Sequence, residues 1–488
     1  MVVLQPGEPA SSRTHMPNND RIIVGIDVGT NKVCTIVAEV DAGPGNRLNV
    51  LGVGAVASEG IAKGMITDIH KASASIAHSL EAAERQSGCR ILSAYVSISG
   101  NHISAINSRG LVAVSNPDRI IGQDDVTRAV DAARAMAIPA GRDVLHVIPR
   151  TYTVDGQDGI QNPVGLSGFR LDVETHVVTG ANNVRENLVR CVQKADVEVD
   201  DLVLSPLASA EAVLTEQEKN MGVVLVDIGH GTTDIAIYAD GSVWHSKVIP
   251  IGGWHLTNDL VIVFNIPYES AEALKLQYGM AIAPGSSRHA QREAKAATGN
   301  GRVPAKGGLA ALGANANGAG HGVPLPVDVL MATAAEEAGI DDGDLLEAET
   351  FEGTIRRISR DEVNEVMAAR LDQLFSMVGD EIRRSGYEGL LPAGMVLTGG
   401  VAQMSNVEAL AAGKLRLPVR TGHPRRIGGL ADVFDSPAYA TSVGLILWGM
   451  KPGATNVPVT EERSGSPKGR GFDKSVLADW LNKFMPRD

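Results

Sequence analysis

The sequence has few aromatic residues, few cysteines and no excess of positive charge. Phe, Trp and Tyr make up 4% of the 488 residues, and the three cysteines, Cys34, Cys89 and Cys191, form no CxxC pair. This spacing excludes a zinc knuckle and a disulfide framework, and it is typical of a reducing compartment. The 44 Lys and Arg residues against 57 Asp and Glu residues give a net charge of −13. That sign argues against a surface that binds nucleic acid, so we expect no nucleic-acid partner.

Two other features are missing. No run of about 18 uninterrupted apolar residues occurs, so we expect no membrane-spanning helix. The pattern GxxxxGK[ST] is absent, which excludes a P-loop nucleotide site. Residues 1–19 are rich in Pro, Ser and Asn and lack the pattern of a signal peptide, which predicts a disordered lead.

What the sequence does contain is a repeated hairpin pattern with an acidic residue inside an apolar strand. Residues 21–40 combine two apolar runs around a Gly-Thr-Asn-Lys turn, and Asp27 lies in the first run. Residues 223–238 repeat this order, with Asp227 before a second glycine-containing turn. One such Asp could simply cap its turn. Two copies favour a duplicated fold with a cleft between the halves.

The residue types at these turns suit a phosphorylated ligand. Backbone N–H groups of a glycine turn and a lysine attract phosphate oxygens. The candidates are Gly29, Thr30, Asn31 and Lys32 in the first turn and Gly229, Gly231, Thr232 and Thr233 in the second. We expect Asp27 and Asp227 to face Mg²⁺, which takes few protein ligands besides phosphates. A third turn, at Gly399 and Gly400, would bring bare backbone against a ribose or purine.

In this order, the motifs resemble those of the superfamily of actin, sugar kinases and heat-shock chaperone ATPases. Segments 27–32, 227–234 and 397–401 resemble its phosphate-1, phosphate-2 and adenosine motifs, and 206–212 and 440–445 resemble its two connecting helices. The resemblance implies an α/β, actin-like two-lobed ATPase fold of duplicated ribonuclease-H-like domains. It also implies ATP and Mg²⁺ as cofactors.

Within this superfamily, the sequence resembles the FtsA family of bacterial cell division proteins over most of residues 20–450 and the tail. The segments 25–32, 205–216, 247–253 and 271–279 carry the resemblance. In that family, a Lys or Glu on the helix matching 271–278 approaches the adenosine. The matching candidates are Glu272 and Lys275.

Two positions leave alternatives open. His230 stands where Gly is usual in the phosphate-2 turn, so the imidazole lies near the phosphates or faces solvent. Glu211, in the first connecting segment, is the candidate base for an ATP hydrolysis that we expect to be slow at most, or it is an acid on a helix surface.

The resemblance also predicts how the chain divides. The expected units are the lead 1–19, a first core subdomain (1A) at 20–88 and 175–205, an inserted α+β subdomain (1C) at 89–174, a second core subdomain (2A) at 206–260 and 391–450, an upper lobe (2B) at 261–390 with a flexible insertion at 283–344, a linker at 451–471 and an amphipathic helix at 472–486.

The tail pattern predicts a membrane-binding helix. Apolar residues recur on one face at helical spacing: Phe472, Val476, Leu477, Trp480, Leu481 and Phe484. Such a face ordinarily packs on its own domain. The preceding linker, the terminal position, Trp480 and the nearby basic residues instead favour reversible binding to anionic lipid.

The resemblance therefore implies an ATP-binding protein that polymerises and anchors the ring of the tubulin-like protein FtsZ to the cytoplasmic face of the membrane at the division site. The upper lobe would dock the C-terminal peptide of FtsZ, and the inserted subdomain would contact other division proteins. Two alternatives remain. One is a small-molecule kinase with its own substrate base, and the other is a soluble pilus-assembly ATPase relative whose terminal helix packs on the body.

Overall fold

The computed structural model describes residues 22–40, 48–135, 138–281, 345–425, 427–428 and 434–451. The expected lead, the insertion at 283–344, the amphipathic helix and all but the first residue of the linker lie outside the described residues, as do the six predicted membrane-binding side chains. Among the described residues, no helix is both long enough and apolar enough to cross a membrane.

Two large sheets share one strand order. The first sheet contains β1 (Ile22–Val28), β2 (Lys32–Val40), β3 (Leu48–Ala57), β6 (Ser93–Ile98), β11 (Glu198–Leu204) and β19 (Ile427–Gly428). The second contains β12 (Val223–Ile228), β13 (Thr233–Ala239), β14 (Ser242–Ile249), β17 (Met395–Thr398) and β18 (Val419–Thr421). The order β3-β2-β1-β6-β11 in one matches β14-β13-β12-β17-β18 in the other.

The strand directions match as well. In each sheet, neighbours among the first three strands are antiparallel, and the last two strands run parallel to the first strand of the hairpin. The central strands are buried on both faces, which explains their nearly continuous apolar sequences. The duplication predicted from the two hairpins is therefore confirmed.

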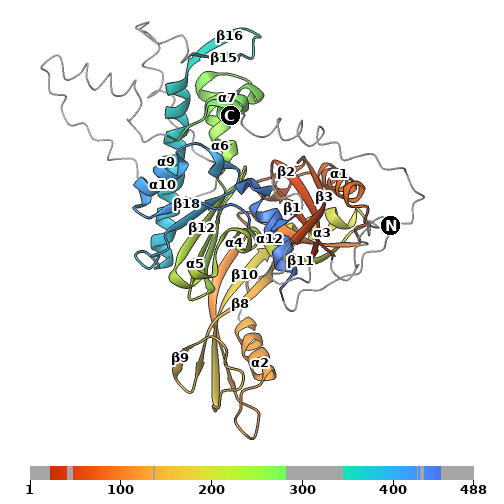
Figure 1. Ribbon diagram of the computed structural model, residues 1–488, viewed down its shortest axis with the longest axis vertical. Helices are drawn as coiled ribbons and strands as arrows, with labels where there is room; N and C mark the ends of the chain where they lie inside the picture. Colours follow the sequence, from red (N-terminus) through yellow and green to blue (C-terminus); the bar gives the residue numbers. More distant parts are fainter. Residues whose placement is uncertain are drawn as a thin grey trace, which may run out of the picture.

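Helices fill the space around and between the sheets. α1 (Ile69–Ser87) and α3 (Asn182–Gln193) pack on one face of the first sheet, and α4 (Ser205–Val213) and α12 (Ala440–Gly449) lie between the two sheets (Figure 1). The crossing of α4 and α12 is close, because a side chain at Gly444 would collide with the carbonyl oxygen of Ala208. These two helices join the halves of the molecule beneath the cleft.

The upper lobe covers the outer face of the second sheet (Figure 1). It contains α6 (Gly253–Phe264), α7 (Tyr268–Tyr278), β15 (Leu345–Glu349), β16 (Ile355–Ser359) and α9 (Arg360–Ser385). A buried ion pair joins two of its helices, since Arg370 Nε on α9 lies 2.5 Å from Asp259 Oδ2 on α6.

The remaining short elements are β4 (Ile61–Ala62), β5 (Met65–Ile66), α5 (Glu216–Met221), η5 (Gly400–Gln403), α10 (Val407–Leu415) and η6 (Pro437–Tyr439).

The inserted subdomain projects from the opposite end of the molecule (Figure 1). Its four-stranded sheet has the order β7-β10-β8-β9, and α2 packs on one face. The elements are β7 (Ser104–Ala113), α2 (Gln123–Arg134), β8 (Arg142–Val154), β9 (Gln157–Ile160) and β10 (Arg170–Ala181). The expected limits of 89 and 174 are therefore both too early. The alternation at 91–98 predicts a strand, but it does not tell which sheet the strand joins, and β6 lies between β11 and β1.

The inserted subdomain also contacts the second half of the molecule, although the chain enters and leaves it from the first. His176 Nε2 on β10 lies 2.9 Å from Ser246 Oγ on β14. The guanidinium of Arg150 lies 3.5 Å from the ring centroid of Trp244 and donates to Tyr387 Oη at 3.2 Å.

Candidate functional site

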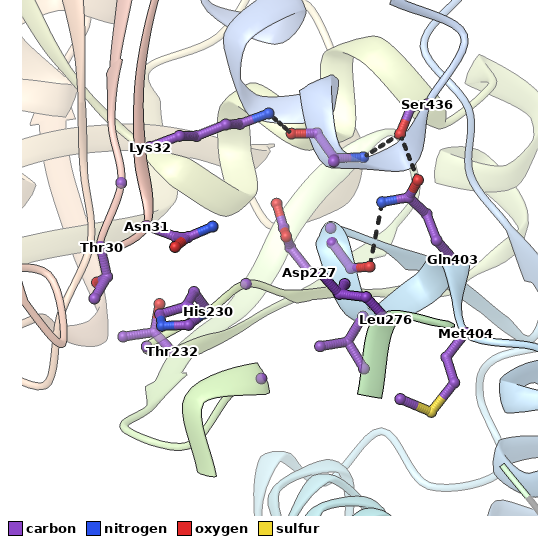
Figure 2. Close-up of a pocket in the computed structure, with 18 of the residues that line it drawn as sticks. Thr30, Asn31, Lys32, Asp227, His230, Thr232, Leu276, Gln403, Met404 and Ser436 are labelled. Carbon is purple, nitrogen blue, oxygen red and sulfur yellow. Dashed lines mark hydrogen bonds between the residues drawn. The ribbon is translucent and has the colours of Figure 1, made fainter. Parts of the chain in front are cut away.

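A cavity of about 540 Å³ lies where the two sheets and the upper lobe meet. Figure 2 shows Thr30, Asn31, His230 and Thr232 on one side of it and Gln403 and Met404 on the other, with Asp227 between them. Thirteen of the fifteen described site candidates line this cavity: Asp27, Gly29, Thr30, Asn31, Lys32, Asp227, Gly229, Gly231, Thr232, Glu272, Lys275, Gly399 and Gly400. The two exceptions are Thr233 and Glu211.

The first turn joins β1 to β2 and is tight. Gly29 N donates to Lys32 O at 3.0 Å, and a Cβ atom at Gly29 would lie only 2.8 Å from that oxygen. Lys32 Nζ donates to Ala438 O at 2.8 Å and lies 3.4 Å from the ring centroid of Tyr439. Burial lowers the pKa of Lys32, and the nearby Cys34 and Asp27 oppose that shift.

Two hydroxyl groups hold the carboxylate of Asp27. Ser97 Oγ on β6 donates to Oδ1 at 2.9 Å, and Ser442 Oγ on α12 donates to Oδ2 at 3.0 Å. Burial raises the pKa of Asp27, while Lys32 and the two serines lower it.

The second turn repeats this arrangement. Gly229 N donates to Thr232 O at 2.9 Å. Asp227 Oδ2 accepts from Ser209 Oγ on α4 at 2.5 Å and from Thr441 Oγ1 on α12 at 3.1 Å. Burial raises the pKa of Asp227 to about 6, and the negative charge of Asp27 adds to the shift.

A further buried carboxylate lies beside Asp227. Asp234 is its cross-strand neighbour, and it accepts from Ser99 Oγ at 2.5 Å and from Thr232 Oγ1 at 3.0 Å. Burial raises the pKa of Asp234 to about 7, with Asp227 contributing. Asp234 lies in the segment 227–234 that resembles the phosphate-2 motif, but it is not among the site residues predicted from the sequence. The signal that could identify it is the register of the hairpin, which pairs residue 227 with residue 234.

The two turns meet across the cleft. A Cβ atom at Gly231 would lie 2.6 Å from Thr30 Oγ1 of the other half. The second turn also rests on the start of α6, because Gly253 N donates to Gly229 O at 2.9 Å and Trp254 N donates to His230 O at 2.8 Å. Both turns therefore line one common space.

The structure places Thr233 and Glu211 elsewhere. Thr233 is buried in β13 and donates to Ile251 O at 2.8 Å, because side chains alternate along a strand and only 232 and 234 face the cavity. Glu211 lies two residues after Ser209 on α4, about 200° around the helix, and forms ion pairs with Lys219 at 3.2 Å and Lys451 at 3.1 Å. Burial alone would raise the pKa of Glu211, but Lys451 and Lys219 lower it. Glu211 does not line the cavity, so of the two alternatives that the sequence left open the geometry favours the acid on a helix surface.

The third turn forms the other end of the cavity. Gly399 has φ +87°, and a Cβ atom there would collide with the Asp227 carboxylate. Gly400 has open space around its Cα, so its bare backbone faces the cavity, as expected. Its carbonyl accepts from Gln403 Nε2 at 3.3 Å, and Gln403 Oε1 accepts from Ser436 Oγ at 3.1 Å.

An ion pair on α7 borders the same cavity. Lys275 Nζ lies 2.7 Å from both carboxylate oxygens of Glu272, and both side chains bond to Thr257 Oγ1, at 2.9 Å from Lys275 and 2.5 Å from Glu272. Burial lowers the pKa of Lys275, and Glu272 opposes that shift.

His230 also lines the cavity. Its imidazole is half-buried, and Nε2 lies 3.4 Å from Tyr268 Oη. Burial, with a contribution from Lys275, lowers the pKa of His230 to about 4, so the ring is neutral at neutral pH. Of the two alternatives that the sequence left open, the geometry supports the one near the phosphate turns.

Other residues complete the lining: Val28, Gly64, Ser99, Ser205, Gly253, Leu276, Gln277, Tyr278, Gly279, Met280, Arg360, Val401, Gln403, Met404, Ser405, Ser436, Ala438, Tyr439 and Thr441. Some of them lie in the segments that carry the resemblance: Val28, Ser205, Gly253, residues 276–279, Val401 and Thr441. The others reach the cavity only through tertiary packing.

The residues present fit a magnesium ion that shares its coordination with a ligand. Within the described residues, no group of three His, Cys, Asp or Glu side chains could hold a metal by itself. Mg²⁺ commonly takes one or two carboxylates and completes its shell with phosphates and water. Asp27 and Asp227 each accept two hydroxyl hydrogen bonds, which leaves lone pairs free on both carboxylates.

Two sheets of one topology, joined beneath a cleft by a pair of crossing helices and facing each other through matched turns, define an actin-like two-lobed protein. A family model described as "Cell division protein FtsA" matches residues 224–444, and one described as "SHS2 domain inserted in FTSA" matches residues 100–179. The second match agrees with the inserted sheet rather than with the expected limits.

Relatives cover almost the whole chain. Cell division protein FtsA of Pseudomonas aeruginosa is 40% identical over 465 residues, which are 95% of this chain and 97% of the relative. Cell division protein FtsA of Escherichia coli is 33% identical over 470 residues, which are 95% and 98% of the two chains. This protein therefore belongs to the FtsA family of cell division proteins.

A solved structure shares the fold at low identity. The PilM-PilN type IV pilus biogenesis complex matches with a TM-score of 0.54 and 15% identity, over 88% of this chain and 99% of that chain. At this identity, the match concerns the fold alone.

Proposed function

We propose that this protein binds Mg-ATP in the cleft and uses the nucleotide to control self-association during bacterial cell division. The observation that carries the proposal is the meeting of the two turns, each with a hydroxyl-braced aspartate behind it, at the end of a cavity whose other end is bare glycine backbone. Membership of the FtsA family supports the same function.

The side chains have distinct roles in this proposal. The N–H groups of the two turns, together with Lys32, would bind phosphate oxygens, and Lys32 would exchange its hydrogen bond to Ala438 O for one to phosphate. Asp27 and Asp227 would hold Mg²⁺, which supplies positive charge to the phosphate oxygens when bound. Gly400, Glu272 and Lys275 would bind the adenosine.

The nucleotide acts in this proposal as a switch rather than as a source of phosphoryl groups. Among the described residues that line the cavity, the carboxylates are Asp27, Asp227, Asp234 and Glu272. The first two would hold the metal, Asp234 accepts from two hydroxyl groups, and Glu272 is paired with Lys275. Each of the four carboxylates is thus already engaged and is not free to take a proton from the attacking water, so we expect slow hydrolysis.

The partners follow from the family. The upper lobe would dock the C-terminal peptide of FtsZ, the inserted subdomain would contact other division proteins and further copies of this chain, and residues 472–486 would bind anionic lipid at the cytoplasmic face of the membrane. The contacts of the inserted subdomain with β14 and Tyr387 of the second half support coupling between that subdomain and the cleft.

The test combines nucleotide and vesicles. The full chain and a version that ends at Arg470 are floated with anionic vesicles in the presence of Mg-ATP or of magnesium alone, and FtsZ is then added. We expect only the full chain to float, and more of it with ATP, because polymers bind a membrane through many tails at once. Flotation of neither version would overturn the membrane role. A turnover of ATP that rises with an added sugar would favour a kinase instead.

A further inference from the structure

His230 occupies a position that the duplication makes easy to interpret. It is the second residue of its turn, where the first turn has Thr30, and both turns close with the same Gly N–H to carbonyl hydrogen bond. Its own backbone is fixed, because Trp254 N donates to His230 O and a Cβ atom at Gly252 would lie 2.7 Å from that oxygen. The backbone that carries the imidazole is therefore held in one position.

The imidazole has one partner and one unused nitrogen. Among the described residues, Tyr268 Oη at 3.4 Å from Nε2 is its hydrogen-bond partner, and Nδ1 has none. In a neutral imidazole one nitrogen accepts and the other donates. If the Tyr268 hydroxyl donates to Nε2, the proton of the ring lies on Nδ1. The ring then offers an N–H donor in the cavity, on the side where Figure 2 shows Thr30, Asn31 and Thr232.

Tyr268 links this ring to the upper lobe. It is the first residue of α7, the helix that also carries Glu272 and Lys275 one to two turns later. Glu272, four residues later on the same helix, accepts from Thr257 Oγ1 and pairs with Lys275. Helix α7 therefore carries both the tyrosine that contacts the second turn and the ion pair expected at the adenosine, so one helix borders both ends of the expected nucleotide.

We propose that His230 donates a hydrogen bond to the terminal phosphoryl group of the nucleotide, and that Tyr268 transmits the occupancy of that position to helix α7. This inference rests on the proposed function, since it assigns a role within the same cleft. A ligand with a third phosphate would gain a contact that a diphosphate lacks, so the pair would set the preference for ATP over ADP.

The test compares affinities for ADP and for a non-hydrolysable ATP analogue, both with Mg²⁺, in the full chain. We expect His230→Gly to weaken binding of the analogue about 10-fold or more, the typical effect of losing one hydrogen bond to a charged group, and to change ADP binding less than about 2-fold. His230→Gln keeps an N–H donor and should restore most of the preference. His70→Gln, on an exposed histidine of α1, is the matched control.

A second measurement reports on helix α7. In the wild type, hydrogen exchange of α7 should be slower with the ATP analogue than with ADP, and Tyr268→Phe should remove this difference while the analogue still binds. An equal loss of affinity for both nucleotides in His230→Gly, or a nucleotide-independent α7, would overturn the inference and leave the proposed function intact. A wild-type chain that binds neither nucleotide would overturn both.

Discussion

The two hairpins of this protein have the same backbone arrangement but different charged side chains. Asp27 and Asp227 occupy the same place, but Asp27 faces Cys34 across its hairpin, whereas Asp227 faces Asp234. The turn after Asp27 ends in Lys32, and the turn after Asp227 ends in Thr232 at the same position. The first hairpin therefore brings one cation and one carboxylate to the cleft, and the second brings two carboxylates. One duplicated scaffold thus supplies both a phosphate-attracting and a cation-attracting pole.

The two poles share one support. Adjacent residues of α12 reach both halves, since Ser442 donates to Asp27 and Thr441 donates to Asp227. Ser209 of α4 bonds to Asp227 and lies 2.8 Å from Thr441. A rotation of one half against the other must strain these hydrogen bonds, which couples the opening of the cleft to its electrostatics.

The largest difference between the two hairpins is expected in the pH dependence of stability that Asp227 and Asp234 cause. The pKa values of Asp227 and Asp234, about 6 and about 7, lie above the unfolded value of 3.8, so the folded state holds its protons longer. Without nucleotide, the free energy of unfolding should fall as the pH rises from about 4 to about 7. Asp234→Asn should flatten this slope and raise the free energy of unfolding at pH 8 by roughly 2 to 4 kcal/mol.

Urea unfolding at pH 5, 6 and 8 without nucleotide measures this effect. Asp118→Asn, at an exposed acid of the inserted subdomain, is the control and should leave the slope unchanged. A slope that is as steep in Asp234→Asn as in the wild type would show that Asp234 is not where the protons bind.

The next effect concerns the cationic pole. Lys32→Ala should lower the affinity for Mg-ATP by roughly 10- to 100-fold, because a buried hydrogen bond to a charged group is worth about 1.5 to 3 kcal/mol. Thr232→Ala, at the matching position of the second turn, should cost only a few-fold. Calorimetric titration at pH 8 compares the two. Equal losses would mean that the turns bind phosphate alike and that the asymmetry has no role in binding.

The sequence predicts the repeated parts of the site well and the non-repeated parts poorly. The hairpins are local, so their glycines, Lys32 and the two acids could be assigned from spacing alone. Gln403, Ser436 and Tyr439 reach the cavity only because β17 pairs with β12 and η6 packs against η5, which no short motif encodes. The predicted limits of the inserted subdomain are displaced for a similar reason. An alternating pattern predicts a strand, but it does not tell which strands pair with it.

A smaller effect is expected at the third turn. The equivalent turn of the first sheet has no pair of glycines. β17 is followed by Gly399 and Gly400, whereas the equivalent β6 is followed by Ser99, which donates to Asp234. Gly399→Ala should destabilise the protein by about 1 to 3 kcal/mol, because of its positive φ and the collision with Asp227. Gly400→Ala has room for its methyl group and should reduce only nucleotide affinity. Thermal unfolding and titration of both variants distinguish steric support from ligand contact.

The smallest effect is expected at Glu211, on the side of α4 that faces away from the cleft. Lys219 is buried but keeps Glu216 at 3.0 Å, and Lys451 is 45% exposed, so Glu211→Gln leaves neither lysine without solvent or a partner. We expect a loss of about 1 kcal/mol of stability and a change of less than about 2-fold in ATP affinity and turnover. Ser209, two residues earlier, bonds to Asp227, so Ser209→Ala should instead alter magnesium dependence. If Glu211→Gln slowed turnover by 10-fold at unchanged affinity, Glu211 would act in hydrolysis. The face of α4 that points away from the cleft would then have a catalytic role as well as a structural one.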